Sequence, residues 1–131
     1  MAKLLKTSFV VMMMGFAGAG PSLAQTLGSA SAGQAVFADQ CAGCHSNQPG
    51  VDGFGPSLAG VYGRMSGTAP LHVYSAAMKN AHVVWNAQNL NLFLQGPRKF
   101  VPGTAMPYAG LASAQARANV IAYLKSISPA G

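Results

Sequence analysis

Acidic residues and cysteines are scarce in this 131-residue chain, and the lack of each excludes some classes of function. Asp39 and Asp52 are the only carboxylic side chains, against eight lysines and arginines, and the formal charge is +6 at pH 7. Two carboxylates offer little acid–base machinery, and the sequence contains no H-E-x-x-H, G-x-S-x-G or phosphate-binding loop. The basic residues form no run interleaved with aromatics, so we expect no nucleic-acid partner.

The two cysteines lie in one pentapeptide, Cys41-Ala42-Gly43-Cys44-His45, which has the C-x-x-C-H pattern of covalent c-type haem attachment. Both thiols can form thioethers to the porphyrin, and the adjacent imidazole can bind the iron. A disulfide or thiol-exchange site is an alternative that does not need His45. A zinc site needs about four ligands, which no second cysteine or H-x-x-x-H pair supplies. We therefore expect one haem c per chain, with its iron.

The N-terminus has the pattern of a secretory signal over residues 1–24. Lys3 and Lys6 supply a positive start, an apolar run follows at 9–19, and Ser22-Leu23-Ala24 is a small-x-small cleavage site. An uncleaved anchor is the alternative, but this run is shorter than the roughly 20 residues that span a bilayer. We expect cleavage and export to the periplasm, since bacterial haem attachment of this type takes place outside the inner membrane.

Residues 25–131 are long enough for one domain and too short for two. A chain of this size buries about two-thirds of its unfolded surface, so a large apolar cofactor in the core would help to stabilise it. The positive charge favours transient docking to acidic redox partners. We expect a monomer without stable membrane insertion once the signal is removed.

Helical periodicity and chain breaks predict an all-α fold of short helices and long loops. A loose lead-in at 25–31 precedes the first helix, which is expected to begin near Ala32 and to carry the haem motif at its end. Ser75, Asn86 and Ser113 are expected to cap three later helices. The predicted ends of these helices are Asn80, the Gly96-Pro97 pair and Pro129, and the predicted loops are 47–70 and 98–110. A buried haem gives such loops a surface on which to pack.

The position on the haem iron opposite His45 matters for function: a protein ligand there favours electron transfer, and an open position favours the binding of small molecules. Outside the signal the candidates are three methionines and two histidines: Met65, Met78, Met106, His72 and His82. Met106 lies between Pro102 and Pro107, which stiffen an extended backbone, and such a loop can present a thioether to the iron. The alternative for Met106 is ordinary core packing. We expect the other four side chains to pack, to be exposed or to be hydrogen-bonded.

In combination these motifs resemble the class I c-type cytochromes, the family of mitochondrial cytochrome c and its small bacterial relatives. The resemblance spans residues 33–125 and implies a cytochrome c-like fold around one covalent haem. It rests on the haem pentapeptide together with Gly33, Phe37, Gly55-Pro56-Ser57-Leu58, Gly63-Arg64, Tyr74-Ser75, Trp85, Leu90 to Leu94, Pro102 to Pro107 and Ile121-Ala122-Tyr123-Leu124.

The resemblance implies a role at the haem for nine residues. Cys41 and Cys44 would hold the vinyl carbons, and His45 and Met106 would be the axial ligands. Pro56 matches the residue whose carbonyl accepts the other imidazole N–H and so orients the ring. Four more match groups near the propionates, which need donors or a cation when buried: Arg64, Tyr74, Trp85 and Thr104. Trp85 as core alone and Arg64 as a solvated charge are the alternatives.

Further implications concern packing and docking. Gly33 and Phe37 against Tyr123 imply a close crossing of the first and last helices. Phe93 stands where the mitochondrial type has a tyrosine hydrogen-bonded near the ligand sulfur, so redox tuning can differ. Lysines are sparse around the expected exposed haem edge at Ala42, Gly43 and Tyr108, the nearest basic residues being Lys79, Arg98 and Lys99, so we expect weak electrostatic steering.

These observations predict a periplasmic one-electron carrier, not an enzyme, that meets donor and acceptor proteins transiently. A haem subunit of a dehydrogenase or oxidase complex shares the chemistry and is the first alternative. A haem peroxidase or small-ligand binder, with Met106 labile or absent from the iron, is the second. The two carboxylates and the lack of an obvious distal histidine disfavour it, and we predict no catalytic residue.

Overall fold

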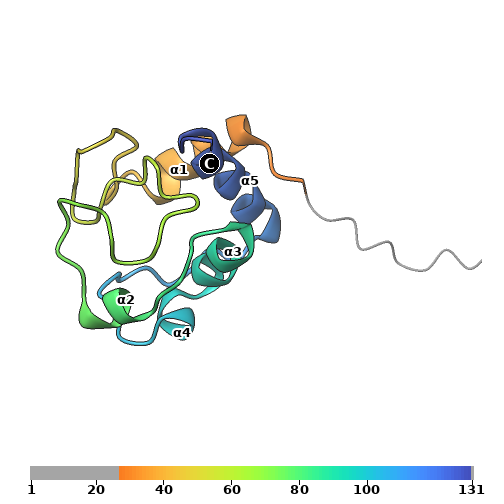
Figure 1. The fold of residues 1–131 in the computed structure, drawn as a ribbon. Coiled ribbons are helices and arrows are strands. Elements are labelled where there is room, and N and C mark those ends of the chain that lie inside the picture. The colour runs from red at the N-terminus through yellow and green to blue at the C-terminus, as the bar shows by residue number, and fades with distance from the viewer. Residues whose placement is uncertain (1–26, 131) are drawn as a thin grey trace, which may run out of the picture.

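Five helices joined by long loops make up residues 27–130, the part of the chain that this computed structural model describes (Figure 1). They are α1 (Ala30–Gln40), α2 (Ala76–Asn80), α3 (Ala87–Gln95), α4 (Pro97–Phe100) and α5 (Ala114–Ser126). The β pairing within these residues is one isolated antiparallel bridge, between Met65 and Val84. The all-α prediction is therefore confirmed. The expected signal segment, 1–24, lies outside the described residues.

Polar side chains begin three helices at the predicted positions. Ser75, Asn86 and Ser113 each accept a hydrogen bond from the backbone N–H three residues later, at 3.2, 2.8 and 3.1 Å. Each cap satisfies one of the N–H groups that the first turn of a helix leaves free. Because this signal is local, the sequence was sufficient to locate all three helix starts.

Helix α1 begins at Ala30, before the expected start near Ala32. Ser29 caps it by accepting a hydrogen bond from the Ala32 N–H at 3.3 Å. The Ser29 N–H in turn donates to the side chain of Asn119 in α5 at 2.9 Å. A contact with a distant part of the chain thus holds this start in place, and the periodicity of the segment could not indicate it.

The segment 98–110 is not wholly a loop, as the sequence predicted, because α4 occupies its first residues. Gly96 ends α3 with extended backbone angles (φ −168°, ψ 88°), and Pro97 stands at the start of α4. The missing N–H of proline is harmless at this position. The Gly-Pro pair that stops one helix therefore starts the next.

The first and last helices cross closely, as expected from Gly33, Phe37 and Tyr123. A Cβ atom on Gly33 would lie 1.9 Å from the carbonyl oxygen of Asn119, so only glycine fits at the crossing. The rings of Phe37 and Tyr123 meet nearby, with centroids 5.4 Å apart. Together with the buried Val120, these residues belong to the apolar core.

The loop of residues 41–75 lies to one side of the helices, at the left in Figure 1, and the loop after α4 passes α2. A Cβ on Gly103 would be 3.1 Å from that of Ala77, which brings the second loop against α2. Within residues 27–130, no helix has both the length and the apolar character to cross a membrane. The two loops carry most of the residues assigned to the haem.

Candidate haem site

The haem pentapeptide follows α1 directly: Cys41 caps the C-terminal end of the helix, and residues 41–44 form a turn. The N–H groups of Cys44 and His45 both donate to the Cys41 carbonyl, at 3.0 and 2.9 Å. Both thiols are free. Burial raises the pKa of the Cys41 thiol to about 11, unlike the lowered values of exchange-active thiols. Across the described part of the chain, no three His, Cys, Asp or Glu side chains group to hold a metal, as a zinc site would require.

The His45 ring is oriented by Pro56, the residue expected to do so. Its Nδ1 lies 2.8 Å from the Pro56 carbonyl oxygen. Since a carbonyl can only accept, Nδ1 carries the proton and Nε2 keeps a free lone pair. Burial lowers the pKa of His45, and the Pro56 bond and the Asp52 charge partly oppose this effect. Burial thus favours the neutral ring, the form that binds a metal.

The lack of a side chain at Gly55 leaves room for the same ring. A Cβ at this position would lie 2.3 Å from His45 Cε1 and 2.7 Å from Nδ1. Real Cβ atoms do not approach that closely, so a side chain here would displace the imidazole. Gly55 and Pro56 thus restrict the position of the ring together, Gly55 by its close approach and Pro56 by its hydrogen bond to Nδ1.

The loop that carries Met106, the methionine loop (residues 101–113), reaches back to the haem pentapeptide. The Tyr108 hydroxyl donates to the side-chain oxygen of Gln40, the residue before Cys41, at 2.9 Å. Further along, the Leu111 N–H donates to a carbonyl of α3 at 2.7 Å. Met106 is half-buried and packs against the apolar core. This arrangement brings the Met106 loop and the cysteines to the same side of the fold.

Of the residues assigned to the propionates, Arg64 and Trp85 are paired through their backbones. The Trp85 N–H donates to the Arg64 carbonyl at 2.9 Å, and the buried indole packs on Phe93 with centroids 4.9 Å apart. The Arg64 guanidinium is half-buried and donates to the carbonyls of Ala59 and Ser57, both at 3.4 Å. These long bonds leave Arg64 with capacity for a further acceptor.

Tyr74 and Thr104 are placed on the two loops. Burial raises the pKa of Tyr74, against a backbone hydrogen bond with Ala69 and the Arg64 cation, which lower it. The Thr104 hydroxyl accepts a hydrogen bond from the Met106 N–H at 3.3 Å and so helps to shape the methionine loop. Tyr74 thus lies in reach of Arg64, while Thr104 accompanies Met106.

The remaining candidate ligands are engaged or exposed. Met78 is buried in the core, Met65 is 40% exposed, and His82 is exposed with a left-handed backbone (φ 50°). His72 is half-buried and pairs with Asp52, its Nδ1 being 3.6 Å from Oδ2. These positions agree with the packing and surface roles expected for Met65, Met78 and His82.

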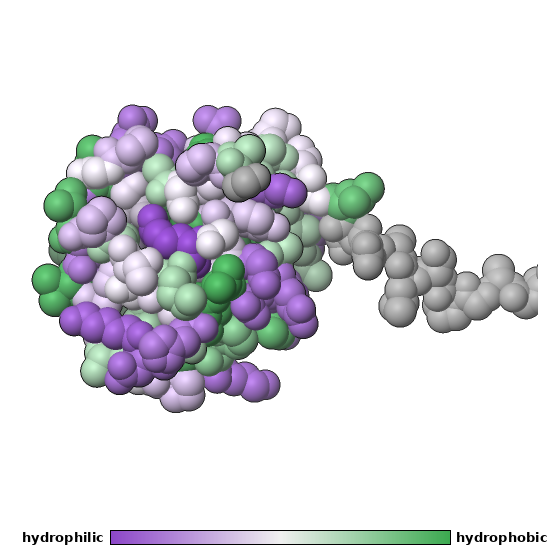
Figure 2. Space-filling view, in the orientation of Figure 1, coloured by the Kyte–Doolittle hydropathy of each residue, from purple (hydrophilic) through white to green (hydrophobic). Residues whose placement is uncertain are grey.

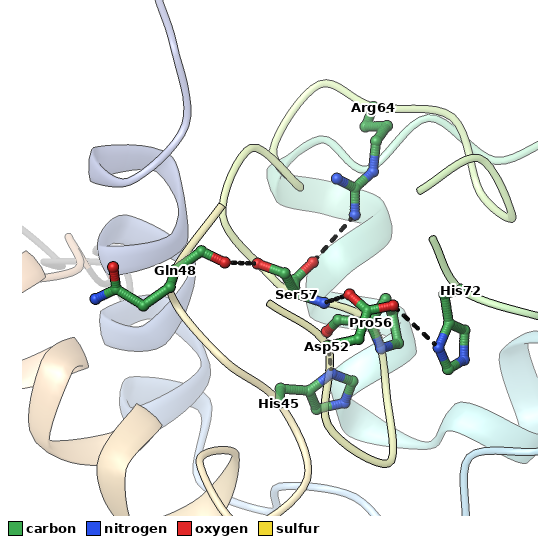
Figure 3. A network of polar contacts seen from close by, with 7 residues as sticks. All are labelled: His45, Gln48, Asp52, Pro56, Ser57, Arg64 and His72. Carbon is green, nitrogen blue, oxygen red and sulfur yellow. Dashed lines mark hydrogen bonds and ion pairs between the residues drawn. The ribbon is translucent and has the colours of Figure 1, made fainter. Parts of the chain in front are cut away.

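Sequence reasoning missed several polar anchors of the site. Asp52 accepts a hydrogen bond from the Ser57 N–H at 2.9 Å, and Ser57 links it to Gln48 and Arg64 (Figure 3). Arg117 is buried in α5 and donates to the carbonyls of residues 111 and 112 at 2.7 and 2.8 Å, which fastens the end of the methionine loop. A hint was available for Asp52 alone, as one of two acidic residues in the chain.

On the face of the molecule drawn in Figure 2, hydrophilic and apolar side chains occupy different regions. Hydrophilic side chains collect over α2 and α4 at the lower edge of Figure 2, where the sequence places Lys79, Arg98 and Lys99. Isolated apolar patches lie over the 41–75 loop at the left edge, and the exposed Phe54 and Val73 belong to that loop. Lys79, Arg98 and Lys99 therefore belong to α2 and α4, and Gly103 brings the loop that carries Met106 against α2.

These features fit a covalently held haem. Two free thiols, a neutral imidazole with Nε2 available and a glycine cradle provide the attachment and one ligand. A cavity of about 630 Å³ lies against the pentapeptide, lined by Cys44, His45 and residues 52–54, among others. Met106 is not among its lining residues. The case for Met106 therefore rests on its loop and not on this cavity.

Comparison with known proteins gives consistent matches. The cytochrome c family model matches residues 30–128. The chain is 48% identical over 100 residues to cytochrome c of Euglena viridis, covering 76% of this chain and 98% of that one, and 44% identical over 100 residues to that of Guizotia abyssinica, covering 76% and 90%. A solved structure, cytochrome cH from Methylobacterium extorquens, matches with a TM-score of 0.71 and 37% identity, covering 76% of this chain and 99% of that one.

Proposed function

The chain belongs to the cytochrome c family, and we propose that it is a periplasmic carrier whose haem iron is bound by His45 and Met106. As a family member it has the cytochrome c fold, binds one haem c covalently and transfers electrons to and from redox partners, and it is not an enzyme. The expectations of a haem c, of electron transfer and of a non-enzymatic role are thus confirmed. Residues 25–131 would form the haem domain.

The observation that carries the ligand proposal is the way His45 is held. Its Nδ1 donates to the Pro56 carbonyl at 2.8 Å, which leaves Nε2 to the iron, while Cys41 and Cys44 would form the thioethers. The thioether of Met106 is presented by a loop that Thr104 and Tyr108 fasten. When bound, the haem would supply a one-electron couple, with His45 and Met106 as the ligands that this chain would offer to its iron. Arg64, Tyr74 and Trp85 would face the propionates.

Carbon monoxide distinguishes this carrier from a ligand-binding haem protein. Wild-type holoprotein, reduced at neutral pH, should bind little carbon monoxide because both axial positions are filled. Met106→Leu should bind it rapidly, whereas Met65→Leu, at an exposed methionine, should behave like the wild type. Rapid and complete binding by the wild type would refute the His45 and Met106 assignment.

The location can be tested separately from the ligands. When the full chain is expressed in a bacterium that attaches haem c, its mature form should begin at Gln25 and appear in the periplasmic fraction. Mass spectrometry of the purified protein reads the first residue directly. A membrane-bound product that retains residues 1–24 would contradict export with cleavage.

A further inference from the structure

Within residues 27–130, the middle of the methionine loop (105–109) is joined to other segments by a single hydrogen bond. The Tyr108 hydroxyl donates to Gln40 Oε1 at 2.9 Å. The other hydrogen bond of this segment, from the Met106 N–H to the Thr104 hydroxyl at 3.3 Å, stays inside the loop. Contact between the middle of the loop and the helix before the haem cysteines therefore depends on one pair of side chains.

The two ends of the loop are fixed by other contacts. At its start, the Thr104 N–H donates to the Val101 carbonyl at 3.0 Å. At its end, the Leu111 N–H donates to the Leu94 carbonyl in α3 at 2.7 Å, and Arg117 holds the carbonyl of Leu111 at 2.7 Å. The effect of the Tyr108–Gln40 bond is therefore confined to the middle of the loop, where Met106 lies.

Pro107 couples the position of Tyr108 to that of Met106. The proline ring fixes its own φ angle at about −65°, and it restricts the residue before it to an extended backbone. Two residues of chain span at most about 7 Å. Because this short segment has so little freedom, a displacement of Tyr108 also displaces Met106.

Gln40 is a fixed point for this bond. It is the last residue of α1 and directly precedes Cys41. Its side-chain nitrogen donates to Asp39 at 2.6 Å, which leaves the oxygen to accept from the Tyr108 hydroxyl. Helix α1 is itself packed against α5 at the close crossing. The bond therefore joins the segment before the haem cysteines to the segment after Met106.

We propose that Tyr108 and Gln40 are positioning residues for Met106, whose hydrogen bond holds the methionine loop closed, keeps the thioether at the iron and excludes small molecules. The inference rests on the proposed function. Opening of the loop breaks no bond of the chain; it withdraws the thioether and leaves its place to an added molecule. One neutral hydrogen bond changes such an equilibrium by a factor of about 2 to 10.

The first test is the rate of carbon monoxide binding to the reduced holoproteins at neutral pH. Tyr108→Phe and Gln40→Leu each remove one partner of the bond, and each should bind about 2- to 10-fold faster than the wild type. The double variant should bind no faster than the single variants, because all three lack the same bond. Gln40→Glu keeps an oxygen acceptor and should remain close to the wild-type rate.

Two controls separate this effect from a general consequence of substitution. Tyr62→Phe removes the hydroxyl from a ring on which Lys125 lies, 5.6 Å from the centroid, and Gln34→Leu changes an exposed glutamine of α1. Both should bind carbon monoxide at the wild-type rate. If the wild type resists carbon monoxide and Tyr108→Phe resists it equally, the proposal is overturned and the assignment of Met106 stands. Rapid binding by the wild type would refute the assignment and the proposal together.

Amide hydrogen exchange of the holoproteins tests the loop independently of the iron ligand. In Tyr108→Phe, the Met106 N–H should exchange about 2- to 10-fold faster than in the wild type, because the middle of the loop opens more often. The Leu111 N–H, whose partner lies in α3, should keep its wild-type rate. An unchanged rate at Met106, or equal acceleration at both amides, would overturn the proposal.

Discussion

The crossing of α1 and α5 and the loops around His45 are stabilised in different ways. The crossing is apolar and close-packed, with Phe37 and Tyr123 in contact and a glycine where the backbones meet. The loops are tied by single polar contacts, such as Pro56 to His45 and Tyr108 to Gln40. Packing should therefore govern global stability, while the polar ties should govern the position of the ligands.

The largest expected effect is the loss of stability on alanine substitution of a phenylalanine at the crossing, compared with one in the 41–75 loop. Phe37→Ala should lower the free energy of unfolding by about 3–5 kcal/mol, because it leaves a cavity beside Tyr123. Phe54→Ala, in the 41–75 loop and 91% exposed, should change it by less than about 0.5 kcal/mol. Guanidinium unfolding of the holoproteins measures both. Equal losses would show that the loop contributes to the core as much as the crossing does.

Glycine-to-alanine substitutions should show the same difference in stability between the crossing and the loop, with smaller losses. Gly33→Ala should cost about 2 kcal/mol or more, since its Cβ would meet backbone atoms of Asn119 that cannot move freely. Gly43→Ala adds a methyl group where no atom lies within 4 Å, so its effect on unfolding should be small. A stable Gly33→Ala protein would mean that the helices can separate without loss.

Gly55→Ala should affect the site more than the fold. The added Cβ would displace the His45 ring, but a side chain can shift, so we expect a cost of about 1 kcal/mol. The haem spectrum and reduction potential should change because the ligand is tilted or its bond to Pro56 is lengthened. Gly43→Ala is the matched control. An unchanged spectrum would indicate that Gly55 does not position the imidazole.

The smallest expected effect is a change in stability at alkaline pH. Burial raises the pKa of Tyr74, so the neutral phenol stabilises the fold below about pH 10, and this contribution is lost as pH rises through the folded-state value. Tyr74→Phe should therefore lose less stability than the wild type above about pH 10. Tyr108→Phe should flatten the curve less, since that tyrosine is less buried. Parallel wild-type and Tyr74→Phe curves would contradict the assignment.

By itself the sequence determined the features that depend on neighbouring residues. The haem pentapeptide, the caps at Ser75, Asn86 and Ser113, and the break at Gly96 are local, because a cap or attachment motif acts within a few residues. The likeness to class I cytochromes extended this to the α1–α5 crossing, which the structure confirms, and to Pro56, whose carbonyl lies within hydrogen-bond distance of His45 in the structure.

The tertiary structure alone decided which distant groups meet. It starts α1 at Ala30 through a bond from Ser29 to Asn119, and it fastens the methionine loop with Tyr108 and Arg117. It also brings Asp52 to His72 across 20 residues of irregular loop. Such contacts depend on how whole loops pack, and no local pattern encodes them, because a charge or hydroxyl gains its partner only when the fold closes.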